Sequence, residues 1–241
     1  MKRQLITLLA SILVLAAAVG TVWYLTAAKS RAQDRIFQTK FEQLQGYDQD
    51  PVLQSFRDGG QKAVMFLARK TKDTDSSTRI KAVSALRSMR SKLTASTEGI
   101  AALCGAVSDS DPKVRSIAEG ALGDIGAGAK AAVPALIQLV SQGEDINGVW
   151  ALGRIGPEAK AALPILESKM RQEMGRERVY AAGAVWAIGG QNDEAKAVIK
   201  KALNDPDKHV QVDAHNVLVQ SPEMNLQQSV TNSSAHASVK V

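Results

Sequence analysis

One segment recurs along the chain, and this repetition constrains the fold more than any other feature of the sequence. The clearest copy occupies residues 109–136, and a related pattern returns thirty residues later at 151–166. Weaker copies occur at 78–86 and 186–197, with a half-copy at 205–218. Similar segments at a spacing of about 20 to 50 residues are typical of solenoids. Because a single unit cannot bury its apolar face alone, we expect stacked units to share one core.

Each unit of the repeat is predicted to be a pair of antiparallel helices. In the first helix of the clearest copy, apolar side chains follow the i, i+3, i+4 spacing of one helix face; they are Val114, Ile117, Ala118, Ala121, Leu122 and Ile125. Asp111 and Pro112 predict its start, because the carboxylate accepts from free N–H groups and proline fits the first turn. Gly126 predicts its end. Pro134 and Pro164 then fall in the first turns of the second helices.

The clearest copy resembles a known family. Residues 109–126 read Asp-x-Asp-Pro-x-Val-Arg-x-x-Ala-x-x-Ala-Leu-Gly-x-Ile-Gly, and Ala-Val-Pro-Ala-Leu follows at 132–136. This pattern is similar to HEAT repeats, especially the short bacterial type related to phycobilisome-lyase repeats. The resemblance covers residues 51–221 and is strongest over 109–166. It implies an all-α fold, an α-solenoid (superhelix) of about four to five degenerate HEAT-like helical hairpins.

The resemblance also implies contacts between neighbouring repeats. In the family, the Asp and Arg at the positions of Asp111 and Arg115 help to form ladders along the stack. Asp75 and Arg79 match them in the preceding copy. In the final copy Gln211 replaces the arginine, and the two middle copies lack the pair, so a continuous ladder is not expected.

An apolar segment precedes the repeats. Residues 5–28 contain no charged side chain, and at about 1.5 Å rise per residue such a helix could span a bilayer core of roughly 30 Å. Trp23 and Tyr24 near its end fit the membrane interface. We expect an uncleaved signal anchor; cleavage of the segment would instead give a secreted protein. The basic start, Lys2 and Arg3, favours a cytoplasmic N-terminus and an extracytoplasmic (periplasmic) repeat domain.

The domain organisation follows from these features. We predict a transmembrane helix over residues 1–28, a juxtamembrane helix and linker over 29–50, the repeat solenoid over 51–221 and a disordered tail over 222–241. The tail is rich in Ser, Asn and Gln, a composition that favours disorder. In the juxtamembrane helix, one apolar stripe is predicted to cap the stack; it consists of Ile36, Phe37, Phe41 and Leu44.

Composition agrees with a helical solenoid. Aromatic residues make up only 4% of the chain against 45% hydrophobic residues, so the core consists mainly of small and aliphatic side chains that suit closely stacked helices. Charge is uneven: residues 57–115 contain twelve basic and six acidic side chains. This basic excess, close to the predicted anchor, suits an anionic lipid surface or an acidic partner.

No pattern typical of a catalytic, cofactor or metal site is present. The single cysteine, Cys104, rules out an internal disulfide and lies in an apolar run, where a buried position is expected. The histidines, His209, His215 and His236, lack the spacing of a zinc site and have no His-Glu pair. The glycines at 120–128 lack the preceding strand and the Lys-Ser/Thr ending of a phosphate loop. We therefore predict a protein that is not an enzyme and has no cofactor.

Two groups of residues are candidates for partner binding. The first is a basic cluster of Arg79, Lys81, Arg87, Arg90 and Lys92. Stacking would bring these side chains together, and they form either a solvated face with some Asp pairing or a contact for anionic lipid or an acidic partner.

The second candidate is a pair of tryptophans. When the copies of the repeat are aligned with one another, Trp150 and Trp186 fall in one column with Ser84, Gly120 and Asn216. That column lies away from the main apolar face, so the indoles form either an aromatic patch for a partner or fillers between alanine-rich repeats.

The leading functional prediction is a non-catalytic scaffold or adaptor that presents a helical surface to another protein near a membrane. A bilin lyase-like, tetrapyrrole-handling accessory is one alternative, suggested by the repeat subtype. Nucleic-acid binding, as in HEAT-like DNA glycosylases, is the other, and we do not expect it of an extracytoplasmic domain. Fold alone does not name the partner.

Overall fold

The computed structural model describes residues 2–45, 50–94, 96–143 and 146–220, with side chains from residue 17 onward. Every regular element in this part of the chain is a helix, as predicted. The predicted tail, residues 222–241, lies outside the described residues.

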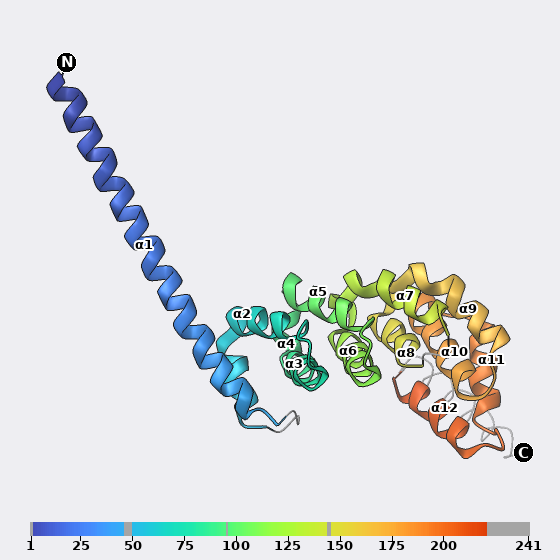
Figure 1. Cartoon of the computed structure of the whole chain (residues 1–241). Helices are drawn as coiled ribbons and strands as arrows, with labels where there is room; N and C mark the ends of the chain where they lie inside the picture. The colour runs from blue at the N-terminus through green and yellow to red at the C-terminus, as the bar shows by residue number, and fades with distance from the viewer. Residues whose placement is uncertain (1, 46–49, 95, 144–145, 221–241) are drawn as a thin grey trace, which may run out of the picture.

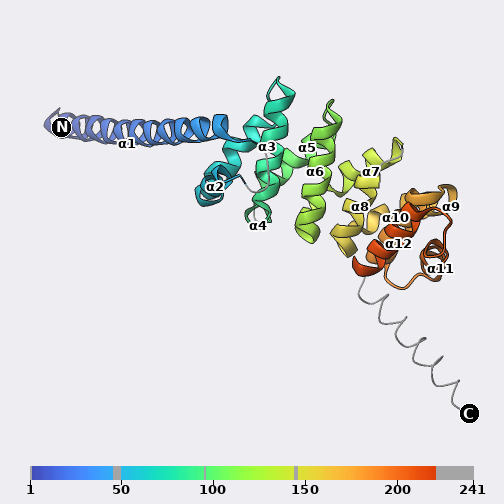
Figure 2. The ribbon, with the colours of Figure 1, turned by 90° about the horizontal axis from the view of Figure 1, so that it is seen from below.

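The N-terminal helix α1, Lys2–Gln43, runs without interruption through the predicted boundary at residue 28 and extends away from the rest of the molecule (Figures 1 and 2). No helix is both long and apolar enough to cross a membrane when only residues with described side chains are considered. The predicted span begins before those residues, so membrane insertion stays a prediction.

The end of α1 packs against α2, Val52–Lys70, which bends at Gly60. Phe37 lies 5.8 Å from Phe56 and Phe41 lies 5.9 Å from Phe66, measured between ring centroids. Phe37, Phe41 and Leu44 are buried, so the predicted capping stripe is confirmed for these three residues. The prediction is wrong for Ile36, which is 50% exposed.

Beyond α2, the helices form two rows (Figure 1). The first helices of the repeats are α3 Ser76–Ser88, α6 Pro112–Ile125, α8 Ile146–Ile155, α10 Gly175–Gly189 and α12 Lys208–Gln220. The second helices are α5 Thr97–Ala106, α7 Val133–Ser141, α9 Leu163–Gln172 and α11 Asp193–Ala202. Short helices lie between them: α4 Arg90–Leu93 and the 3₁₀ helices η1 Gly126–Ala132 and η2 Gly156–Ala162. Seen from below, α3, α6 and α8 lie side by side (Figure 2). The predicted all-α solenoid is therefore confirmed.

The predicted start and stop signals act as expected. The Asp111 carboxylate accepts from the backbone N–H of Lys113 at the start of α6. Three first helices end at a glycine with positive φ, a conformation that side chains disfavour; these are Gly126 (67°), Gly156 (71°) and Gly190 (79°). Pro134 and Pro164 lie in the first turns of α7 and α9.

Small residues let the first helices approach one another closely. A Cβ atom placed on Gly123 of α6 would lie 2.2 Å from Cζ3 of Trp150 on α8. One placed on Gly153 of α8 would lie 3.1 Å from the Cα of Ala184 on α10. Glycine at these positions is therefore a packing requirement of the first row.

A charged ladder joins two repeats, although its acidic member differs from the prediction. Arg79 of α3 donates from Nε and Nη2 to both carboxylate oxygens of Asp109, at 2.7 and 2.8 Å. Asp75 and Asp111 instead cap their own helices, so assigning them to the ladder was wrong. Arg115 donates to the carbonyls of Asp109 and Ser110 within its own repeat.

Removing the charge of Asp109 is expected to weaken the fold at neutral pH. The two side chains are only 12% and 10% exposed, and the Arg79 hydrogen bond holds the pKa of Asp109 below its ordinary value of 3.8. Asp109→Asn should lower the free energy of unfolding by about 1.5 kcal/mol at pH 7. Because the folded-state pKa is depressed, this contribution is fully present above pH 3.8 and is lost as pH falls through the folded-state value.

Urea unfolding of wild type and variant along a pH series measures this difference. Asp58→Asn is the matched control, because Asp58 is exposed and its carboxylate accepts from the uncharged Gln54. A difference between wild type and Asp109→Asn that stays constant down to pH 2 would contradict the assigned ion pair.

Candidate binding groove

A hollow of about 230 Å³ opens on the first row of helices, over α10 and between α8 and α12. We call it the inner-face groove. Its lining comprises Trp150, Gly153, Arg154, Tyr180, Gly183, Ala184, Ala187, Val217 and Gln220. Glycine and alanine form most of the floor because these positions face the adjacent helix at short range. Longer side chains from α8 and α12 form the walls.

The groove lies on the concave side of the stack. The indole Nε1–H of Trp150 on α8 donates to Oε1 of Gln220 on α12 at 3.2 Å, although α10 lies between these helices in the stack. Side chains on two helices that are separated by a third can meet only on the side toward which the row of helices curves. Figure 1 agrees, since α11 lies on the outer side of the bend and α12 on its inner side.

Arg154 is held at the rim by an aromatic ring. Its guanidinium carbon lies 5.9 Å from the centre of the Trp150 ring, a cation–π geometry. The side chain is exposed, and within the described part of the chain it takes part in no ion pair. The groove therefore has an aromatic wall with an accessible positive charge beside it.

The groove is bordered at α10 by a closed polar network. Asp213 of α12 is only 4% exposed; it pairs with Arg176 and accepts from the Tyr180 hydroxyl at 2.9 Å. Burial, followed by the hydrogen bond to Asp213, raises the pKa of Tyr180 above its ordinary value. The same carboxylate raises the pKa of Arg176. The acid of this network is thus already neutralised within the chain.

The two tryptophans do not form a joint surface patch. Trp186 is 5% exposed and belongs to the core, whereas Trp150 is half-buried and lines the groove. The predicted register was wrong by two residues. Trp186 lies four residues before Gly190, as Leu122 and Leu152 lie four residues before their own terminal glycines, and both leucines are fully buried.

The predicted basic cluster is divided by internal pairing. Arg79 binds Asp109, and Arg87 binds Asp124 at 2.8 Å between Nε and Oδ2. Of the remaining cluster residues, which are Lys81, Arg90 and Lys92, the first is half-buried and the other two are exposed at the short helix α4. Two of the five cations are therefore part of the repeat packing.

Metal ligation finds no support in the described part of the chain, where no three acidic, histidine or cysteine side chains converge. His209 and His215 are exposed on α12, and His236 lies outside the described residues. Cys104 is half-buried, and burial raises the pKa of its thiol.

Sequence reasoning missed Arg154, Tyr180 and Gln220 as groove residues. The last two come from repeats whose copies of the motif are weak, so their positions could not be aligned. For Arg154 the sequence held a signal. Arg154 lies two residues before Gly156, and the same position before Gly126 in the strongest copy is the oppositely charged Asp124.

Comparison with known proteins supports the fold. The family model described as HEAT repeats matches residues 64–147, inside the predicted range of 51–221. A search of curated proteins returns no match. The crystal structure of an engineered protein superposes with a TM-score of 0.51 at 20% sequence identity, covering 81% of this chain and 92% of that chain.

Two further solved structures give lower scores. A designed armadillo repeat protein in complex with the peptide (KR)4 has a TM-score of 0.48 at 17% identity, over 75% of this chain and 97% of that chain. The archaeal HEAT-like repeats protein from Thermococcus onnurineus NA1 has a TM-score of 0.48 at 15% identity, over 75% of this chain and 80% of that chain.

Proposed function

We propose that the chain is a non-catalytic protein-interaction scaffold or adaptor, tethered to a membrane by α1, that holds a segment of a partner protein in the inner-face groove. The observation that carries this proposal is the groove itself, with its small-residue floor, its half-buried indole and its accessible arginine. Stacked helical repeats commonly use their concave surface for binding. Half-buried tryptophan and arginine are also the residue types enriched at the energetic centre of protein interfaces.

The size of the groove favours a polypeptide segment over a large cofactor. Pockets for small molecules and cofactors have volumes of roughly 300 to 1,000 Å³, whereas this hollow has about 230 Å³. It suits one or two side chains of a chain that continues beyond it. The tetrapyrrole-handling and nucleic-acid alternatives have no comparable support and serve as outcomes of the test below.

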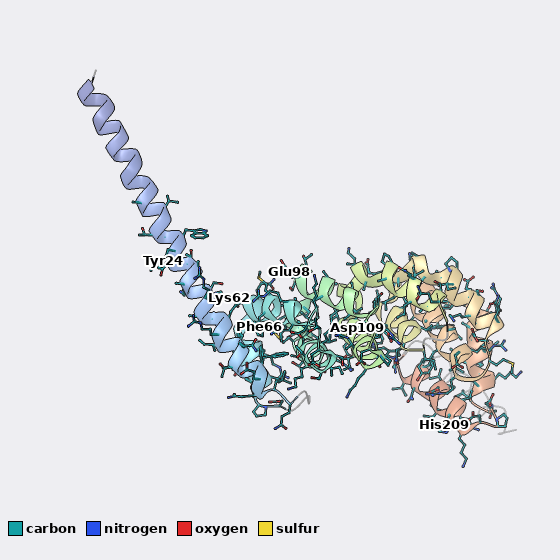
Figure 3. The ribbon with its side chains drawn as sticks, in the orientation of Figure 1. Tyr24, Lys62, Phe66, Glu98, Asp109 and His209 are labelled. Atoms are coloured by element: carbon teal, nitrogen blue, oxygen red, sulfur yellow. The ribbon has the colours of Figure 1, made fainter. Side chains whose placement is uncertain are left out.

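The tether proposal rests on α1. Trp23 and Tyr24 are 70% and 64% exposed. Tyr24 lies on the part of α1 that extends away from the repeats (Figure 3). We propose a single-pass anchor with an extracytoplasmic, periplasmic repeat domain, which would be secreted if the segment were cleaved. Since α1 continues without a break into the part that packs on α2, the anchor would set the orientation of the solenoid.

Anionic lipid is proposed as a second contact, close to the anchor. Exposed side chains gather on one face at the end of α2: Lys62, Met65 and Arg69 lie on the helix, and Lys72 lies in the turn that follows it. Arg69 pairs with Asp34 of α1 at 2.9 Å, and Asp34 lies six residues beyond the predicted span, about 9 Å along the helix axis. That distance is close to the Debye length of about 8 to 10 Å, within which charged headgroups act on a protein surface.

The proposed function is tested by crosslinking in intact membranes followed by identification of bound proteins. Trp150→Ala and Arg154→Gln are compared with wild type and with Arg90→Gln, which removes an exposed charge outside the groove. We expect the chain in the membrane fraction and a protein partner that both groove variants lose while Arg90→Gln keeps it.

Other results of this experiment would contradict the proposal. A chain found only in the soluble fraction would disprove the tether. A partner captured equally by all variants would remove the groove from the function. Co-purified colour, or nucleic acid retained in a strongly salt-dependent way, would favour one of the two alternatives instead.

A further inference from the structure

We propose that the inner-face groove recognises an acidic side chain, Asp or Glu, in an otherwise small or apolar segment of the partner, and that Arg154 supplies the countercharge. This inference rests on the proposed function and adds the chemistry of the partner. It depends on one charge reversal in the repeat and on the absence of a carboxylate from the described residues that line the groove.

The charge reversal becomes visible when the repeats are aligned by their terminal glycines. Asp124 and Arg154 each lie two residues before the glycine that ends their helix, Gly126 or Gly156. The carboxylate of Asp124 accepts a hydrogen bond from Nε of Arg87, which lies on α3, the first helix of the preceding repeat. One repeat later the acid is replaced by a base, so the position carries a positive charge.

Neither neighbouring helix supplies a partner for that charge. On the preceding helix α6, the residue in the position of Arg87 is Gly123, thirty-six residues further along. On the following helix α10, the positions that line the groove beside Arg154 are Ala184 and Ala187. At α6 the charge at this position, Asp124, is paired within the solenoid. At α8 the corresponding charge, Arg154, is available to a carboxylate of another protein.

The other charged groups near the groove do not compete for this role. Asp213 is buried and already binds Arg176 and Tyr180, so it is not available to Arg154. Arg176 is in turn neutralised by Asp213, although its side chain is 50% exposed. Arg154 therefore remains the cation of the groove lining that has no acidic partner among the described residues.

The arginine is also suitably oriented for a carboxylate. Its contact with the Trp150 ring restricts the guanidinium, and a restricted planar guanidinium binds a carboxylate through two parallel hydrogen bonds at low entropic cost. The floor positions Gly153 and Gly183 pack against Ala184 and Val217 of the next helix, so they add no long side chain to the groove beside Arg154. Together these features favour a short acidic side chain flanked by small residues.

The test measures binding of two fluorescein-labelled peptides to the full chain in lipid nanodiscs by fluorescence anisotropy. The probes are Gly-Ala-Glu-Ala-Glu-Ala-Gly and the same peptide with both Glu replaced by Gln. We expect wild type to bind the Glu peptide at least about tenfold more tightly than the Gln peptide, with the preference falling as salt rises. Arg154→Gln should abolish this preference. Arg90→Gln, which changes net charge equally, should retain it.

Each other result overturns the inference in a distinguishable way. Equal binding of the Glu and Gln peptides by wild type would disprove the charge preference while leaving groove binding intact. Loss of the preference in Arg90→Gln as well would show that net charge, and not the groove, attracts the peptide. If neither peptide binds wild type although a crosslinked partner depends on Trp150, the proposed function stands and the acidic-segment inference is wrong.

Discussion

Trp186→Ala is expected to lower the free energy of unfolding by about 3 to 5 kcal/mol, the usual cost of removing a large buried aromatic side chain. Trp186 is 5% exposed and occupies the position of Leu122 and Leu152, two fully buried leucines in the two preceding repeats. Removing the indole would leave a cavity in the core beside α10, which packs against α8, α9, α11 and α12. Urea unfolding followed by circular dichroism measures this loss.

Trp150→Ala is the matched comparison, because Trp150 is only half-buried at the groove. We expect a clearly smaller loss of stability, together with the loss of partner capture described above. Equal losses for the two tryptophans would contradict the assigned register. A stable Trp186→Ala variant that loses its partner would restore the aromatic patch expected from the sequence.

Gly123→Ala is expected to destabilise the wild type and to stabilise a chain that already carries Trp150→Ala. In wild type the new methyl group would lie 2.2 Å from Cζ3 of Trp150, and such overpacking costs about 1 to 3 kcal/mol. Once the indole is removed, the three closest contacts of the methyl group are gone. Alanine then exceeds glycine in helix propensity by about 1 kcal/mol, so the sign of the effect reverses.

The four chains of this double-mutant cycle are compared by thermal or urea unfolding. Gly105→Ala is the control, because Gly105 lies in helix α5 with no atom within 4 Å of the added Cβ. It should stabilise both backgrounds by about 0.5 to 1 kcal/mol. Additive effects of Gly123→Ala and Trp150→Ala would show that the two residues do not touch.

The strongest sequence signals predicted the fold. Asp111 with Pro112, and the glycine at 126, mark the ends of α6 because caps and positive-φ residues act locally. The apolar stripe around Phe37 and Phe41 was found because helix periodicity is also local. Both features depend on residues within a few positions of each other.

The groove and the ladder partner depend on contacts that local patterns do not encode. The register of Trp186 requires knowing that Gly190 is the positive-φ glycine that caps α10, whereas the sequence alignment placed Trp186 in the column of Trp150. Choosing Asp109 over Asp111 as the partner of Arg79 requires the distance between two repeats. The meeting of Trp150 and Gln220 requires the curvature of the whole stack.

The hydrogen bond between Trp150 and Gln220 has a mechanical consequence. In a solenoid, each repeat interacts almost entirely with its immediate neighbours. Bending or stretching is therefore spread over many small changes between adjacent repeats. This bond joins helices two steps apart, so straightening of the superhelix at this point would break it, at a cost of about 1 kcal/mol. A ligand that separates the two side chains would remove that cost. Binding in the proposed groove would therefore make the C-terminal repeats easier to straighten.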